Sequence, residues 1–191
     1  MTQLLTIERT FTAGLEDKGS RFLGHLVPYA RFDETLATLR EEHRKASHHV
    51  TAFRHMLPDN RIEEGAKDDG EPAGTSGMPM LKVLIGANLV DTGVIVVRYF
   101  GGTKLGAGGL ARAYAGTASR CIDAATLVPW HRMATRSLSF PFDAMSDAEQ
   151  MVASLELEVT ARNFTETGCV LTVKGPEDTL AKLQDSGEAD A

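Results

Sequence analysis

The sequence is poor in the features that mark secreted, membrane-spanning and disulfide-rich proteins. It holds only two cysteines, Cys121 and Cys169, in 191 residues. Their spacing fits neither a disulfide framework nor a zinc module, so we expect two buried thiols in a reducing compartment. No segment approaches the roughly 18 apolar residues of a membrane span, and the first residues lack the basic start and apolar stretch of a secretion signal. We therefore expect a cytoplasmic protein without a membrane partner.

An excess of positive charge is also absent. The chain has 20 Lys and Arg against 26 Asp and Glu, a net charge of −6. Such a balance argues against a protein that coats nucleic acid with its whole surface. A hydrophobic content of 42% is typical of an ordinary globular protein, and the length favours two domains. Any site for an anion must therefore be local.

The order of predicted elements indicates an α+β protein with two domains. For the first domain, residues 1–127, we expect strands at 4–11 and 20–30 around a turn at 13–19, a helix at 31–46, a strand at 48–57, a polar loop at 58–74, a helix at 77–89, a strand at 91–100 and a helix at about 110–125. The run at 91–100 is nearly all apolar, which favours a central strand buried on both faces.

A short linker at 128–133, marked by Pro129, separates the second predicted domain, residues 134–187. Its pattern gives strands at 135–142, 155–161 and 168–174, with helices at 143–155 and 177–184. This βαββα order is that of a ferredoxin-like domain without its last strand. The tail at 185–191, DSGEADA, offers no strand to complete it.

A glycine-rich basic segment, RYFGGTKLGAGGLARAY at 98–114, joins the apolar strand to the following helix. Backbone N–H groups at a helix start are unpaired and favour an anion, above all a phosphate. Lys104, Arg98 and Arg112 could add positive charge. The segment has neither the P-loop ending nor the dinucleotide-binding spacing. Its glycines could instead serve only the backbone conformation or close packing: Gly101, Gly102, Gly106, Gly108 and Gly109.

A second, acidic cluster lies in the loop KDDGEPAGTSG, where three carboxylates occupy four residues: Asp68, Asp69 and Glu71. These side chains could bind a hard cation, cap a helix, or pair with the basic segment in a purely structural network. His48 and His49 point to opposite faces if they share a strand. One of them could act as a general base or orient a phosphate, although no zinc-ligand spacing is present.

Several stretches of the first domain together resemble the signature of the IMPACT family, whose bacterial members are YigZ-like proteins. The resemblance is carried by KGSRF at 18–22, EHRKASHHVTAF at 42–53, DDGEPAGTSGMPML at 68–81 and VIVVRYFGGTKLGAGGLARAY at 94–114. It implies a first domain with the βαβ-rich fold of elongation factor G domain four, and a second domain similar to the ferredoxin-like domains of that factor. The matching residues form the expected site: His48, Asp68, Asp69, Glu71, Arg98, Lys104, Arg112 and Tyr114.

The resemblance implies a role in translation, because family members in eukaryotes restrain a kinase that phosphorylates an initiation factor. We expect a non-enzymatic regulator that binds RNA or a ribosome-associated partner through the basic glycine segment, with no cofactor and no metal. An enzyme related in fold to the GHMP kinases, with magnesium at Asp69 and Glu71, is the first alternative. A protein–protein adaptor is the second.

Overall fold

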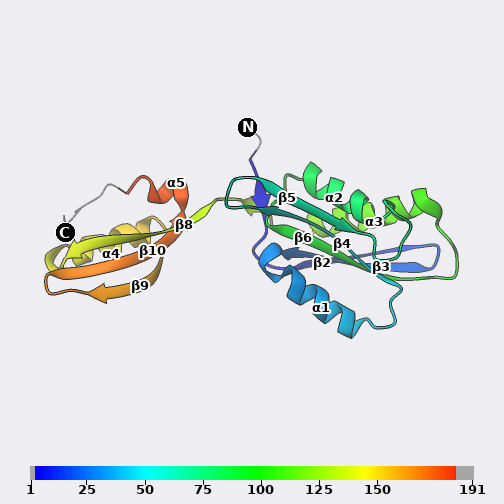
Figure 1. Ribbon diagram of the computed structural model, residues 1–191, viewed down its shortest axis with the longest axis horizontal. Coiled ribbons are helices and arrows are strands. Elements are labelled where there is room, and N and C mark those ends of the chain that lie inside the picture. Colours follow the sequence, from blue (N-terminus) through cyan, green and yellow to red (C-terminus); the bar gives the residue numbers. More distant parts are fainter. Residues whose placement is uncertain (1–2, 184–191) are drawn as a thin grey trace. The chain divides into compact units, whose positions relative to one another are not determined.

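The computed structural model describes residues 3–183 and divides into two compact units, Met1–Trp130 and His131–Ala191. Both units are mixed α and β (Figure 1). The strands of the first unit are β1 (Leu5–Thr6), β2 (Phe11–Asp17), β3 (Ser20–Pro28), β4 (His48–Met56), β5 (Ile62–Lys67), β6 (Thr92–Tyr99) and β7 (Val128–Pro129). Its helices are η1 (Tyr29–Arg31), α1 (Phe32–Glu42), α2 (Gly77–Gly86) and α3 (Gly106–Asp123).

The first unit is built on a five-stranded sheet of order β2-β3-β6-β4-β5, in which every neighbouring pair is antiparallel. The connection from β3 through α1 to β4 passes over β6, and that from β5 through α2 to β6 passes over β4. Helices α2 and α3 cover one face, and α1 covers the other (Figure 1). The central strand β6 therefore lies between two helical layers.

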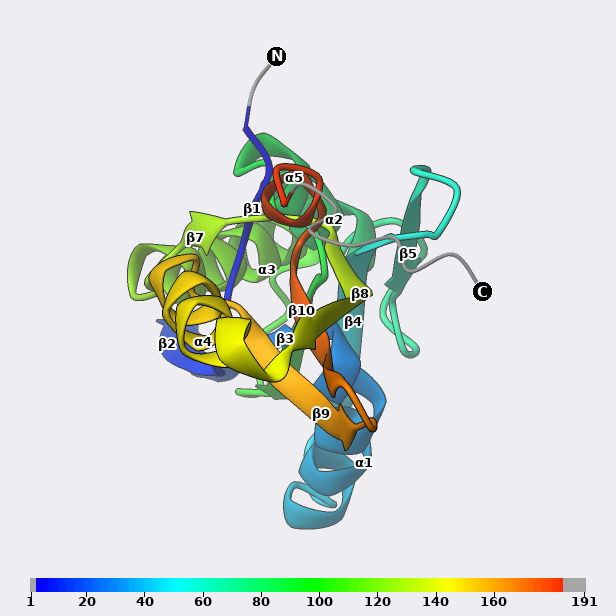
Figure 2. The same ribbon diagram turned by 90° about the vertical axis from the view of Figure 1, so that its left-hand side faces the viewer.

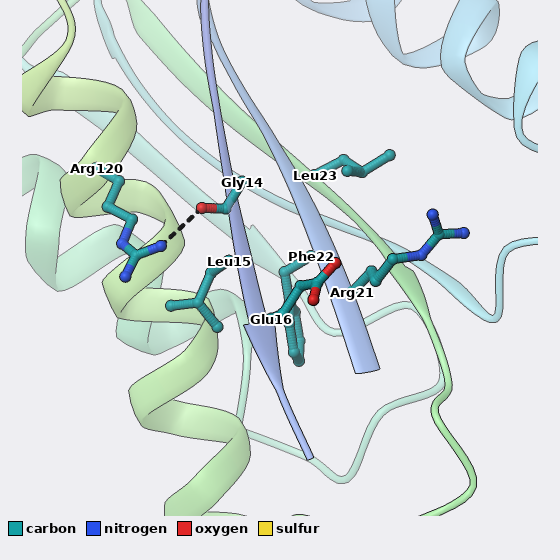
Figure 3. Close-up of a pocket in the computed structure, with 7 residues that line it drawn as sticks. All are labelled: Gly14, Leu15, Glu16, Arg21, Phe22, Leu23 and Arg120. Atoms are coloured by element: carbon teal, nitrogen blue, oxygen red, sulfur yellow. Dashed lines mark hydrogen bonds between the residues drawn. The ribbon is translucent and has the colours of Figure 1, made fainter. Parts of the chain in front are cut away.

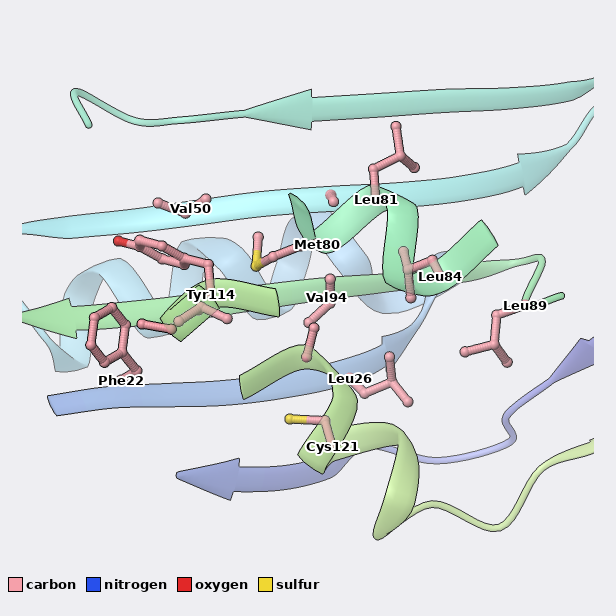
Figure 4. Packing of buried hydrophobic residues seen from close by; sticks show 14 of the residues in the cluster. Phe22, Leu26, Val50, Met80, Leu81, Leu84, Leu89, Val94, Tyr114 and Cys121 are labelled. Carbon is pink, nitrogen blue, oxygen red and sulfur yellow. The ribbon is translucent and has the colours of Figure 1, made fainter. Parts of the chain in front are cut away.

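The central position of β6 confirms the expectation from its apolar run. Val94 and Val96 enter the core beneath α2 and α3, whereas Ile95 and Val97 pack on the α1 side. Figure 4 shows Val94 among side chains of the larger core, including Tyr114 from α3. Both cysteines are free and buried, as expected, and burial raises the pKa of the Cys121 thiol to about 11.

Several local expectations were wrong, beginning with the strand at 4–11, because residues 7–10 separate β1 from β2. The first hairpin turns at Lys18 and Gly19, not over 13–19, because both residues adopt the positive φ of a tight two-residue turn. The loop expected at 58–74 contains the polar edge strand β5, which pairs with β4. Helix α3 begins at Gly106, about a turn earlier than expected. Its first turn is largely glycine, a poor helix former, so the sequence pattern placed the start too late.

The last residues of the first unit pair with its first residues. Strand β7 pairs with β1, and Trp130 Nε1 donates a hydrogen bond of 2.6 Å to Asp91 Oδ2. Residues 128–130 of the expected linker therefore lie in the first unit.

The second unit contains β8 (Met133–Pro141), η2 (Phe142–Ala144), α4 (Met145–Ser154), β9 (Glu158–Phe164), β10 (Gly168–Pro176) and α5 (Glu177–Leu180). Its sheet has the order β8-β10-β9, with α4 packed against β8 and β10 (Figure 2). Its own core includes Leu138, Val152 and Leu171. The tail at 185–191 lies outside the described residues. Within residues 3–183, no helix combines the length and apolarity needed to cross a bilayer.

Candidate phosphate-binding site

Strand register brings Phe22, Arg98 and His48 side by side on the sheet face that carries α2 and α3. Arg98 of β6 lies opposite Phe22 of β3 on one side and His48 of β4 on the other. Arg98 follows Val94 and Val96 at period two, so its side chain shares their face. The distant segments KGSRF, SHHV and VVRYF therefore meet at one end of the sheet.

Glu71 is the centre of a buried polar network at this end. Its Oε1 accepts hydrogen bonds from Arg98 Nη1 at 2.6 Å and from the Tyr114 hydroxyl at 2.7 Å. His48 Nε2 lies 3.8 Å from the same oxygen. The side chains of Glu71 and Arg98 are only 3% and 6% exposed. Burial, then the hydrogen bond to Glu71, raises the pKa of Tyr114, so the phenol stays protonated and donates. The acidic loop and the basic segment thus meet through the ion pair of Glu71 and Arg98, one of the arrangements considered from the sequence.

Asp68 is used by the backbone of the following helix. Its Oδ1 accepts hydrogen bonds from Ser76 and from Gly77 N, and its Oδ2 accepts one of 2.7 Å from Gly74 N. Burial opposes ionisation of this carboxyl, but the hydrogen bonds outweigh it and hold its pKa below the ordinary value. Asp68 therefore caps the start of α2 across the loop.

Asp69 fixes the loop to the start of strand β4. Its Oδ2 accepts a hydrogen bond of 2.7 Å from His49 N, and Arg40 lies 3.4 Å from its other oxygen. His48 Nδ1 donates to the Asp69 carbonyl at 2.8 Å. His48 and His49 do point to opposite faces, and burial lowers the pKa of the His49 imidazole.

A pocket of about 300 Å³ lies beside the buried network and at the start of α3. Its lining is formed by Glu71, Pro72, Arg98, Phe100, Lys104, Leu105, Gly106, Ala107 and Leu110. Helix α3 has no side-chain cap and no acidic residue in its first turn. Lys104 is exposed, and Arg98 Nε is buried with no hydrogen-bond partner among the described residues. The lining therefore combines unpaired helix amides with two cationic side chains.

The glycines of the segment have different local reasons. Gly102 and Gly106 adopt positive φ, at 86° and 73°. A Cβ on Gly101 would overlap the backbone of Gly19, and one on Gly109 would lie 2.9 Å from Leu105 Cβ. Positive φ thus accounts for Gly102 and Gly106, and close packing for Gly101 and Gly109. Gly108 meets no such demand, because an added Cβ would only touch the end of a flexible side chain.

Arg112 is not brought into this pocket. It lines a separate hollow between α2 and α3 with Lys82 and Pro79. Tyr114 is fully buried beneath the network. Another hollow lies between β2, β3 and α3 and contains Arg120. Arg120 Nη1 donates a hydrogen bond of 2.8 Å to the Gly14 carbonyl (Figure 3). Within residues 3–183, no three His, Cys, Asp or Glu side chains are grouped as metal ligands would be.

Sequence reasoning missed two residues of the site. Phe100 lines the pocket and is 50% exposed, with Arg98 Cζ 5.6 Å from its ring centroid. Ser20 Oγ accepts hydrogen bonds from Gly101 N at 3.1 Å and from Arg98 Nη2 at 3.4 Å. The KGSRF motif contains the signal for Ser20, whereas a single aromatic beside two glycines carries no periodic signal.

The comparisons with known proteins agree on one family. The Impact N-terminal domain model matches residues 18–122. The IMPACT family member YvyE of Bacillus subtilis is 45% identical over 98 residues, 50% of this chain and 44% of that protein. The member YigZ of Escherichia coli is 41% identical over 110 residues, 56% of this chain and 54% of that protein. The chain thus spans about half the length of these curated relatives.

Two further matches cover more of the chain. An IMPACT family member of Thermus thermophilus is 40% identical over 144 residues, 73% of this chain and 75% of that protein. A crystal structure described only as a hypothetical protein superposes with a TM-score of 0.69 at 29% identity, over 95% of this chain and 89% of the other. The similarity to that structure therefore extends beyond the family segment into the second unit.

Proposed function

The chain belongs to the IMPACT family, and from this premise we propose that it is a translation-linked protein that binds RNA by holding a backbone phosphate at the start of α3. The observation that carries the proposal is the pocket in which the uncapped helix start, Lys104 and Arg98 converge. The link to translation extends the family resemblance.

The start of α3 supplies the neutral part of the anion site. The first N–H groups of a helix have no partner within it, and the helix dipole places partial positive charge there. The first turn, residues 106–109, is glycine and alanine, so none of its own side chains is larger than a methyl group. Phosphate oxygens are suited to such a helix start.

Charge in the pocket also favours an anion. Glu71 is the acidic residue of the lining, and Arg98 neutralises it at 2.6 Å. Lys104 is exposed and makes no ion pair among the described residues, so it leaves one net positive charge beside the helix start. A few such contacts suffice for a protein of net charge −6, because phosphate contacts supply most of the affinity for RNA.

The alternative function, a nucleotide-binding enzyme with magnesium at Asp69 and Glu71, is less well supported by the contacts of these two side chains. Asp69 accepts from His49 N and pairs with Arg40, and one oxygen of Glu71 accepts from Arg98 and Tyr114. The carboxylates expected to hold magnesium therefore have other partners.

The likeness of the two units to elongation factor G domains is part of the proposal. The strand order β8-β10-β9 within a βαββα unit supports it for the second unit.

The test is fluorescence anisotropy of a labelled RNA hairpin with a single-stranded tail, titrated over a range of salt. Lys104→Ala should weaken binding and reduce the slope of log K against log salt by about 0.7, the value for one lost contact to a single strand. Lys174→Ala, an exposed lysine of the second unit, is the matched control and should bind like the wild type.

Two outcomes would contradict the proposal. One is no binding by the wild type at low salt. The other is equal loss in both variants, which would indicate diffuse attraction instead of a site. A parallel arm adds ATP with magnesium or with EDTA. A metal-dependent rise in melting temperature without RNA binding would favour the enzyme instead.

A further inference from the structure

We infer that the pocket at the start of α3 receives one unpaired ribonucleotide of a single-stranded RNA segment, with its phosphate at the helix, its base on Phe100 and its ribose hydroxyl at Glu71. The inference rests on the proposed RNA binding and goes beyond it, because phosphate binding alone does not distinguish single strands from duplexes, or RNA from DNA.

Phe100 supplies a surface for the base. Half of its surface is open to solvent, although it directly follows a strand in which Thr92 to Arg98 are buried. Exposure of a large apolar ring costs free energy that burial elsewhere would recover. The ring also lies at the phosphate pocket and in contact range of the Arg98 guanidinium. Aromatic rings beside basic grooves are the stacking platforms of proteins that bind single strands.

The position of the ring favours an unpaired base. In an A-form duplex the bases are stacked on one another, and proteins reach mainly phosphates and hydroxyls. A ring that lines the same pocket as the phosphate site can stack only on a base that has left such a stack. The pocket volume of about 300 Å³ is at the lower end for ligand sites and suits one nucleotide unit.

Glu71 offers an acceptor for the sugar. Its Oε1 already accepts from Arg98 and Tyr114, but Oε2 has no partner among the described residues, and Glu71 lines the pocket. A carboxylate oxygen accepts a hydrogen bond from a hydroxyl group and repels a phosphate. Of the groups in a nucleotide strand, the 2′-hydroxyl is the donor that RNA has and DNA lacks.

The experiment compares three labelled probes of one sequence by anisotropy: a 12-nucleotide RNA strand, the same strand as DNA, and the RNA in a blunt duplex. We expect the RNA strand to bind more tightly than the other two. Phe100→Ala should weaken its binding roughly 5- to 150-fold, the range for loss of one stacked base, and leave the salt slope unchanged. Phe100→Trp, which keeps a stacking surface, should retain binding.

Phe164→Ala is the matched control, because Phe164 is 70% exposed but belongs to the second unit. Equal binding of strand and duplex, with Phe100→Ala like the wild type, would overturn the inference. Lys104-dependent binding in that case would leave the proposed function standing. Equal binding of RNA and DNA strands would overturn the sugar contact. Failure of every RNA probe to bind at low salt would remove both proposals.

Discussion

Glycines of the basic segment are required for different physical reasons, and substitution by alanine can test each reason. A Cβ on Gly101 would overlap the backbone of Gly19, which cannot give way like a flexible side chain. At Gly108, in the first turn of α3, φ is ordinary and the nearest atom to an added Cβ is Arg112 Nη1 at 3.4 Å. Only the first position therefore needs glycine for packing.

We expect Gly101→Ala to lower the free energy of unfolding by about 1–3 kcal/mol through overpacking. Gly108→Ala should raise it by up to about 1 kcal/mol, because alanine restricts the unfolded chain and favours the helix. Urea denaturation followed by circular dichroism measures both. Destabilisation by Gly108→Ala would contradict the conclusion that a Cβ fits at this position. Each variant serves as the control for the other, since both add the same methyl group.

At the scale of an element, the start of α2 depends on a residue eight positions before its N-cap. Ser76 is the N-cap but makes no capping bond with its own side chain. Asp68 instead accepts hydrogen bonds from Ser76 and Gly77, and one from Gly74. The loop before α2 is thereby fastened to the helix.

Asp68→Asn should lower the free energy of unfolding by about 1–2 kcal/mol at pH 7, because the amide turns a donor toward backbone donors. The folded pKa of Asp68 is depressed, so its contribution is present above the unfolded value near 3.9 and lost as pH falls through the folded pKa. The gap between variant and wild type should therefore shrink in urea titrations at pH 3. Asp59→Asn should change little, because the exposed Asp59 carboxylate accepts hydrogen bonds from the nearby Arg61. A gap that grows in acid would exclude this role.

Some helices and strands could be predicted from the sequence, and others could not. The unbroken apolar run predicted the central strand β6, because only a strand buried on both faces tolerates it. Strand β5 was missed, since its polar sequence has no strand pattern of its own and pairing with β4 holds it in place. Motifs identified Glu71, Arg98 and Lys104 of the pocket but missed Phe100, and they did not predict the roles of these residues. Whether Arg98 meets a ligand or Glu71 depends on register and burial across three strands, which no local pattern encodes.

At the scale of the whole molecule, the first unit carries both its own core and the complete candidate site. Helices α2 and α3 bury one side of its sheet and α1 the other, and all three helices belong to this unit. Its two ends are joined by β1 and β7, and Trp130 is bonded to Asp91. A shortened chain must therefore keep residue 130 to remain intact.

A chain ending after Trp130 should unfold in one cooperative transition and bind the RNA strand within a few fold of the full-length affinity. All nine residues lining the pocket at the start of α3 belong to this unit, and so do the partners of Glu71. Circular dichroism melting measures the first expectation, and anisotropy with the same RNA probe measures the second. A chain ending after Leu127 is the matched control and should melt at a lower temperature, because it loses β7. A fragment that folds but loses RNA affinity more than tenfold would instead place part of the RNA surface on the second unit.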